Sequence, residues 1–84
     1  MEEQRVTVEN NLGIHARPAT KIIQTAGGYE SKIELIADGV TADAKSIMSV
    51  MMLAAAHKTV VTIRAEGPDE KNAAAAIAEL FRDK

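Results

Sequence analysis

The stretch Arg5–Ala26, RVTVENNLGIHARPATKIIQTA, predicts a strand, a loop and a helix in direct succession. Polar and apolar residues alternate over Arg5–Glu9, which is typical of a half-buried strand with both of its valines facing a core. Pro18 suits the first turn of a helix, where the missing N–H of proline leaves no hydrogen bond unmade. Helical spacing then predicts a helix over Arg17–Ala26 whose buried stripe is Ala19, Ile22, Ile23 and Ala26.

The remainder of the chain repeats these two patterns. Strands are expected at Lys32–Ile36 and Val40–Ala42, joined by an Asp38-Gly39 hairpin turn, and at Thr59–Glu66. A short helix is expected over Ile47–Leu53. The last helix is expected to be capped by Asp69 and to bury Ala73, Ala74, Ile77, Leu80 and Phe81. The order βαββαβα predicts an α+β fold: a four-stranded, mostly or wholly antiparallel sheet with three helices on one face.

Composition narrows the function classes. With 84 residues, the chain is expected to form one domain over residues 1–84. A net charge of −2, one Tyr, one Phe and no Trp give no support to nucleic-acid binding. Without cysteine there is no disulfide or thiolate site, and the histidines lack the neighbours of a metal site. We expect a cytoplasmic protein with no signal peptide and no membrane insertion.

The loop before the first helix carries the candidate reactive group. His15 lies between Gly13 and Pro18, just before a helix N-terminus. The N–H groups of Ala16 and Arg17 would point outward there with the positive end of the helix dipole, which favours anions. The planar guanidinium of Arg17 suits phosphate oxygens. The residues therefore point to a nucleophilic imidazole whose phosphorylated form is stabilised, against the alternative of a loop histidine beside a solvated arginine.

Two apolar faces mark the helix expected after Ser46. Ser46 itself is predicted to be its N-cap, which needs no further role. Val50 and Leu53 share one face of the helix, and a small domain buries only one face. The surplus face either packs under a loop or forms a docking surface, for which flexible methionines are suited. Its members are Ile47, Met48, Met51 and Met52.

Two motifs resemble those of HPr, the histidine-containing phosphocarrier family of the phosphoenolpyruvate-dependent sugar phosphotransferase system. Gly13–Ala19, GIHARPA, resembles the active-site signature, and Lys45–Met51, KSIMSVM, resembles the regulatory-serine region. The resemblance runs over essentially the whole chain and implies an open-faced β-sandwich. It implies a phosphocarrier rather than an enzyme, without a cofactor, that accepts a phosphoryl group on Nδ1 of His15 from phosphorylated enzyme I.

The resemblance also implies how the carrier is used. The phosphoryl group would pass to sugar-specific IIA components of permeases, and a monomer is expected. Ser46 would be a regulatory phosphorylation site, with an HPr kinase/phosphorylase and a transcriptional regulator as further partners. Partner docking is expected at five residues on the two helices beside the histidine, namely Thr20, Gln24, Ile47, Met48 and Met51.

Three alternatives are weaker. A nitrogen-branch relative of HPr, acting in a regulatory phosphorelay, shares the histidine motif. An independent hydrolase with His15 as general base would need a serine or carboxylate that the sequence does not force near it. An RNA-binding domain would need the sheet aromatics that the composition lacks.

Overall fold

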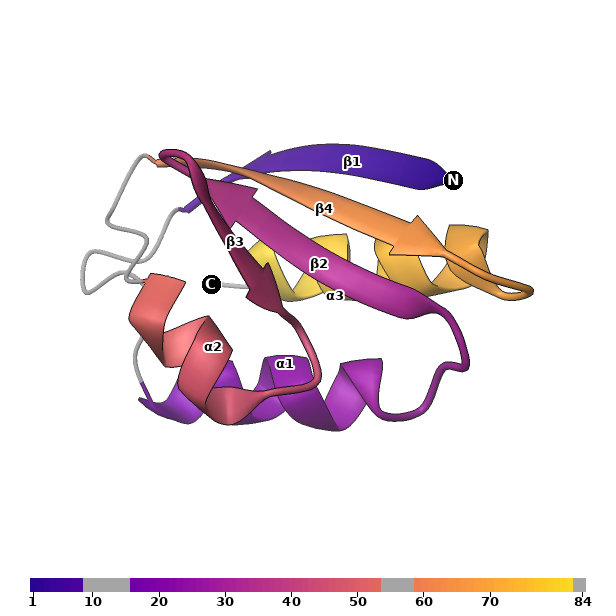
Figure 1. Ribbon diagram of the computed structural model, residues 1–84, viewed down its shortest axis with the longest axis horizontal. Coiled ribbons are helices and arrows are strands. Elements are labelled where there is room, and N and C mark those ends of the chain that lie inside the picture. Colours follow the sequence, from indigo (N-terminus) through magenta and orange to yellow (C-terminus); the bar gives the residue numbers. More distant parts are fainter. Residues whose placement is uncertain (9–15, 54–58, 83–84) are drawn as a thin grey trace.

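The computed structural model describes residues 1–8, 16–53 and 59–82, with the side chains of residues 16–18 and 82 left out. The observed elements follow the predicted order βαββαβα (Figure 1). Their bounds are β1 Glu2–Thr7, α1 Ala16–Ala26, β2 Lys32–Ala37, β3 Val40–Asp43, α2 Ile47–Leu53, β4 Val60–Glu66 and α3 Glu70–Arg82. Within these ranges, no helix is long and apolar enough to cross a membrane.

The four strands form one sheet in the order β1-β4-β2-β3, and all three pairings are antiparallel. The β2–β3 hairpin turns at Asp38 and Gly39, whose φ angles of 50° and 79° are both in the left-handed region. A two-residue turn with this geometry matches the twist of the strands that it joins, which is why Asp-Gly favours it. The antiparallel sheet and its hairpin are confirmed.

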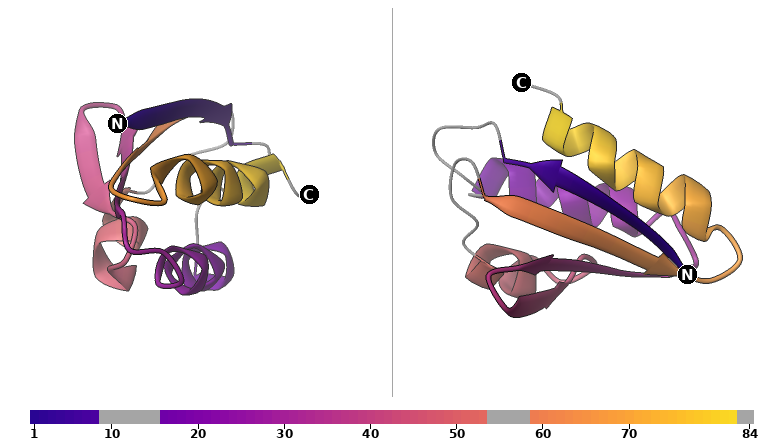
Figure 2. Two further views of the ribbon diagram at one scale, coloured as in Figure 1. Left: turned by 90° about the vertical axis from the view of Figure 1, so that its right-hand side faces the viewer. Right: turned by 90° about the horizontal axis from the view of Figure 1, so that it is seen from above.

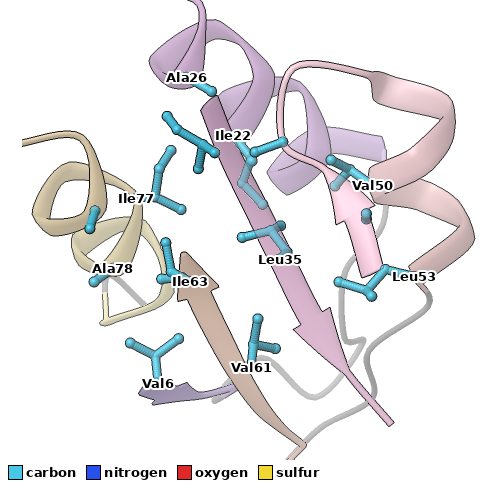
Figure 3. Close-up of a cluster of buried hydrophobic side chains, with 14 of the residues drawn as sticks. Val6, Ile22, Ala26, Leu35, Val50, Leu53, Val61, Ile63, Ile77 and Ala78 are labelled. Carbon is cyan, nitrogen blue, oxygen red and sulfur yellow. The ribbon is translucent and has the colours of Figure 1, made fainter. Parts of the chain in front are cut away.

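One face of the sheet is covered by the three helices, and the other is open (Figure 2). Leu35 of β2 is paired with Ile63 of β4, and both are fully buried on the covered face. Ile22 of α1 and Ile77 of α3 belong to the same buried cluster (Figure 3). The open face is polar, and a hydrogen-bonded ion pair joins Arg64 Nε to Glu3 Oε2 at 2.9 Å across β4 and β1.

Most of the predicted core is confirmed, but Ile23 of α1, predicted to lie in the buried stripe, is only partly buried. Val8, Ala19, Ile33, Val61 and Ala65 are buried as expected. In α3, however, Leu80 and Phe81 are only partly buried, and Ala78 is fully buried in their vicinity along the helix. The alanine-rich face of α3 therefore supplies most of its buried surface, and small side chains let a helix approach a sheet closely.

β1 begins earlier than the alternation of residue types indicates. It starts at Glu2, where Glu2 is paired with Ala65 and Gln4 with Ile63 of β4. β1 lies at the edge of the sheet, where Glu3 and Arg5 are exposed and Glu2 and Gln4 are only half-buried. Backbone pairing, which does not depend on side-chain type, extends the strand where hydrophobic periodicity gives no signal.

The start of α3 differs from prediction in its capping partner. Glu70 Oε1 accepts a hydrogen bond from the N–H of Gly67 at 3.2 Å, in the manner of a capping box. The carboxylate of Asp69 instead accepts hydrogen bonds from Glu30 N at 2.9 Å, Ser31 N at 3.0 Å and the Ser31 hydroxyl. Asp69 does occupy the N-cap position, because its carbonyl oxygen accepts a hydrogen bond from Ala73 N at 2.9 Å. The expectation that its side chain caps α3 is wrong, since that carboxylate binds the segment before β2 instead.

This contact predicts a pH-dependent stability. The hydrogen bond from the Ser31 hydroxyl, followed by that from Glu30 N–H, holds the pKa of Asp69 below its ordinary value. A carboxyl whose pKa is lower in the folded state stabilises the fold above its unfolded pKa, and this contribution is lost as the pH falls through the folded pKa. We expect Ser31→Ala to reduce stability at pH 7 and to flatten the loss of stability below about pH 4.

Urea denaturation from neutral to acid pH measures this effect. Ser46→Ala is the control, because it removes a helix cap whose hydroxyl bonds Ser49 N rather than Asp69, and it should lower stability by a similar amount at every pH. Parallel pH curves for wild type and Ser31→Ala would show that the hydroxyl does not set the Asp69 pKa.

Candidate functional site

The candidate site begins at the N-terminus of α1. α1 starts at Ala16, one residue earlier than predicted, so the residue before the helix is position 15. Its first turn contains no acidic residue, so no carboxylate there offsets the positive end of the helix dipole. His15 and its loop lie outside the described residues, as does the side chain of Arg17. The observed start of α1 is within one residue of the predicted start.

The second part of the site is the start of α2. Ser46 O accepts a hydrogen bond from Val50 N at 3.0 Å, and Ser46 Oγ accepts one from Ser49 N at 3.3 Å. Ser46 is thus the N-cap of α2, as predicted. Its own N–H donates to Asp43 O at 3.0 Å, which ties the cap to the end of β3.

Lys45 holds the segment before this cap in place. Its Nζ donates a hydrogen bond to the carbonyl oxygen of Tyr29 at 2.8 Å, and its backbone N–H donates to Asp43 Oδ1 at 2.9 Å. The bond to Tyr29 joins the turn after β3 to the segment that follows α1. Sequence reasoning missed it, because the two residues are 16 positions apart and nothing in either segment indicates the other.

α2 buries one face and exposes the other. Val50 and Leu53 point into the core (Figure 3). On the opposite face, Met48, Met51 and Met52 are 67%, 43% and 74% exposed, and we call these three residues the methionine surface. The sequence left open whether the second apolar face of this helix packs under a loop or is exposed. For the three methionines, the face is exposed.

Two predicted docking residues differ from the rest in exposure. Ile47 is partly buried and packs against the core, so it contributes less to the exposed apolar face of α2 than Met52 does. Thr20 on α1 is also only half-buried and already has an interaction partner, whereas Gln24 is exposed. The periodicity of a seven-residue helix could not separate Ile47 from Met52, since both fall near the edge of the apolar arc.

The two helices are neighbours in space. α1 packs against α2. The N-terminal end of α1 and the C-terminal end of α2 lie at the same end of the molecule in both Figure 1 and the right-hand view of Figure 2. The methionine surface is therefore on the helix beside the start of α1.

No group of three or more His, Asp or Glu side chains suited to a metal ion occurs among the described residues. His15 and His57 both lie outside them. The site consists, in its described part, of one helix start, one capped helix and an exposed apolar surface.

Comparison with known proteins gives one consistent family. The model of the PTS HPr component phosphorylation site matches residues 2–83. Phosphocarrier protein HPr of Xylella fastidiosa strain Temecula1 is 44% identical over the whole chain, which covers 94% of that relative.

Solved structures agree. HPr-C-His from Thermoanaerobacter tengcongensis is 39% identical with a TM-score of 0.92, the alignment covering 98% of this chain and 92% of that one. A structure described as an HPr dimer from the same organism, also 39% identical, has a TM-score of 0.76 and coverage of 98% and 94%. The similarity is therefore found both in the sequence and in the fold, over nearly the whole chain. The chain belongs to the HPr family of phosphocarrier proteins of the phosphotransferase system.

Proposed function

We propose that this protein carries a phosphoryl group on His15, received from phosphorylated enzyme I and passed to IIA components of sugar permeases. The observation that carries the proposal is the start of α1 at Ala16, directly after His15, with no acidic residue in the first turn. Such a helix end favours the phosphoryl charge and disfavours imidazolium. A neutral imidazole is the nucleophilic form.

The transfer needs little beyond position and charge. A ring nitrogen of His15 forms a bond to phosphorus as the bond to the donor breaks, and the phosphoryl oxygens need hydrogen-bond donors throughout. In this proposal the N–H groups of Ala16 and Arg17 and the guanidinium of Arg17 serve as those donors. A few donors of this kind stabilise the phosphohistidine only moderately. Moderate stabilisation suits a carrier, because the phosphoryl group must then be transferred to the next protein.

The experiment that tests the proposal also separates the sugar branch from the nitrogen branch. The chain is incubated with phosphoenolpyruvate and either the sugar-branch or the nitrogen-branch enzyme I. Faster labelling with the sugar-branch donor is expected. Faster labelling by the other donor would assign the protein to the regulatory relay, and labelling by neither would overturn the carrier role.

We infer that partners dock on the methionine surface with the exposed part of α1. Met48→Asp should slow phosphoryl transfer from enzyme I by about tenfold, because a carboxylate placed in an apolar interface must be desolvated. Stability should change by less than about 1 kcal/mol, since Met48 is exposed.

Initial rates of transfer and urea denaturation measure the two effects. Leu53→Ala is the matched control on the buried face of the same helix: it should cost about 2–5 kcal/mol of stability and leave transfer by the folded fraction near normal. Unfolding of Met48→Asp, or normal transfer with it, would remove docking from this surface.

We propose further that Ser46 is a regulatory phosphorylation site, modified by an HPr kinase/phosphorylase, whose product is read by a transcriptional regulator. Ser46 adjoins the methionine surface in sequence and caps α2. A phosphate there adds about −1.5 to −2 charge at neutral pH. Ser46→Asp is expected to slow phosphorylation of His15 by about tenfold, through repulsion and desolvation of the added charge.

Ser46→Asn separates charge from capping, because asparagine is also a good N-cap but is neutral. It should transfer at close to the wild-type rate, with circular dichroism and melting unchanged in both variants. Equal rates for the aspartate and asparagine variants, together with no labelling of wild type by the kinase and ATP, would leave Ser46 as a helix cap only.

We expect the carrier to act as a monomer. In support, β1 pairs with β4 of the same chain, and the TM-score is higher with HPr-C-His than with the HPr dimer. Light scattering on the eluting peak of a gel-filtration column tests this expectation.

A further inference from the structure

We propose that the methionine surface is a reversible oxidation site, at which sulfoxide formation slows phosphoryl transfer while the fold is kept. The sulfoxides would form on Met48, Met51 and Met52. The regulatory consequence rests on the proposed function, because it requires that partners dock on α2. The assignment of the oxidation site to the methionine surface does not depend on the proposed function.

The chain concentrates its oxidisable sulfur on this one helix. It has no cysteine and no tryptophan, and three of its four methionines belong to the methionine surface. Met48 and Met52 are more than two-thirds exposed, and Met51 is less so. A hydroperoxide or hypohalous acid therefore finds its accessible thioethers on α2 and at Met1, and no thiolate competes for it within the chain.

The reaction is balanced with hydrogen peroxide as the oxidant. A lone pair of the thioether sulfur attacks one peroxide oxygen, a sulfur–oxygen bond forms, the oxygen–oxygen bond breaks, and water is released. Sulfur is oxidised by two electrons and the peroxide is reduced by two. A thiol-dependent methionine sulfoxide reductase reverses the change, with the thiols as the reductant.

The fold tolerates the added oxygen because α2 is held by its other face. Val50 and Leu53 are buried, and the Ser46 cap lies at the N-terminal end of the helix. The sulfoxide oxygens would project into solvent, where their hydration costs the folded state nothing. No core volume changes.

The same oxygens should impair docking. Met48 lies three residues before Met51 and four before Met52, so the three side chains are neighbours on the helix surface. A sulfoxide on any one of them places a strong hydrogen-bond acceptor in the middle of the apolar surface. A partner that covers this surface must desolvate that acceptor or leave it unpaired.

The experiment compares wild type with Met48→Leu/Met51→Leu/Met52→Leu, in which leucine keeps the apolar volume without the sulfur. Both are treated with hydrogen peroxide, which catalase then removes. Peptide mass mapping locates the added oxygen, melting curves report the fold, and phosphoryl transfer from enzyme I gives the functional readout. The triple leucine variant keeps Met1, so it is the in-chain control for oxidation away from α2.

Oxidised wild type should carry oxygen on α2, with Met48 and Met52 ahead of Met51, and should transfer about five- to tenfold more slowly. The treated triple leucine variant should transfer at the rate that the same variant has before treatment. Melting should be nearly unchanged, and the reductase should restore transfer.

Failure takes distinct forms. Oxygen that does not reach α2, an oxidised chain that transfers as fast as the untreated one, or a loss of rate that accompanies unfolding would overturn the oxidation switch alone. If the untreated chain accepts no phosphoryl group from enzyme I, the proposed function falls and takes the regulatory consequence with it.

Discussion

Replacing His15 with alanine is expected to abolish phosphorylation by enzyme I, with at least about a thousandfold loss of rate. The reason is chemical rather than structural: alanine offers no ring nitrogen to accept the phosphoryl group. The variant is expected to fold, with a melting curve close to that of wild type.

His57→Ala is the matched control, because the chain has two histidines and this change removes the other one. It should be phosphorylated at close to the wild-type rate. Rates are followed by acid-labile label from phosphoenolpyruvate through enzyme I. Normal labelling of His15→Ala, or its loss in His57→Ala, would place the phosphoryl group elsewhere.

Replacing Gly67 with alanine is expected to lower the free energy of unfolding by about 4 kcal/mol. Gly67 has φ +151°, which side chains rarely adopt, and an added Cβ would lie 2.7 Å from both Cα and Oγ of Ser31. We assign about 2 kcal/mol to the strained backbone and about 2 kcal/mol to displaced neighbours. Because Ser31 would have to move, the hydrogen bonds that it and Glu30 make with Asp69 would weaken as well.

Gly39→Ala separates strain from crowding. Gly39 has φ +79°, but a Cβ there would meet nothing within 4 Å, so only the left-handed backbone should cost stability, about 1–2 kcal/mol. Urea denaturation of both variants gives the comparison. Equal losses at the two glycines would mean that the close approach of Gly67 to Ser31 contributes nothing.

The fold could be predicted from local patterns because the two central strands, β2 and β4, bury alternate residues. Ile33 and Leu35 of β2, and Val61 and Ile63 of β4, are buried as the alternation required. The hairpin followed from the Asp-Gly pair. The ends of elements could not be predicted as well, since β1 extends over polar residues that pair only through the backbone.

Contacts between distant segments gave no sequence signal. Asp69 is 38 residues from Ser31, and Lys45 is 16 residues from Tyr29. A hydrogen bond of this kind depends on where two turns meet after folding, and many serines or lysines would fit such a role equally well. The side chain of Asp69 was therefore predicted to cap α3, the nearest helix in sequence. The side-chain hydrogen bond found at this helix start is instead the one from Gly67 N–H to Glu70 Oε1.

For the candidate site, the helix start and the helix cap could be predicted from the sequence, whereas the exposure of individual side chains could not. The glycine, histidine, arginine and proline spacing located the helix start at Ala16 to within one residue. The cap at Ser46 was likewise correct. The apolar residues of α2 that face solvent are set by the orientation in which the helix packs in the folded protein. In that orientation Met52 is exposed and Ile47 is partly buried.

The central claim is that the phosphoryl group resides on His15, and locating it is the most direct measurement. The wild-type chain is phosphorylated by enzyme I and phosphoenolpyruvate, digested at neutral or alkaline pH, and its peptides are sequenced by mass spectrometry. We predict a single acid-labile phosphoryl group on the peptide that contains His15. An acid-stable phosphate on a serine, or a phosphohistidine at position 57, would show that the carrier site is not at the start of α1.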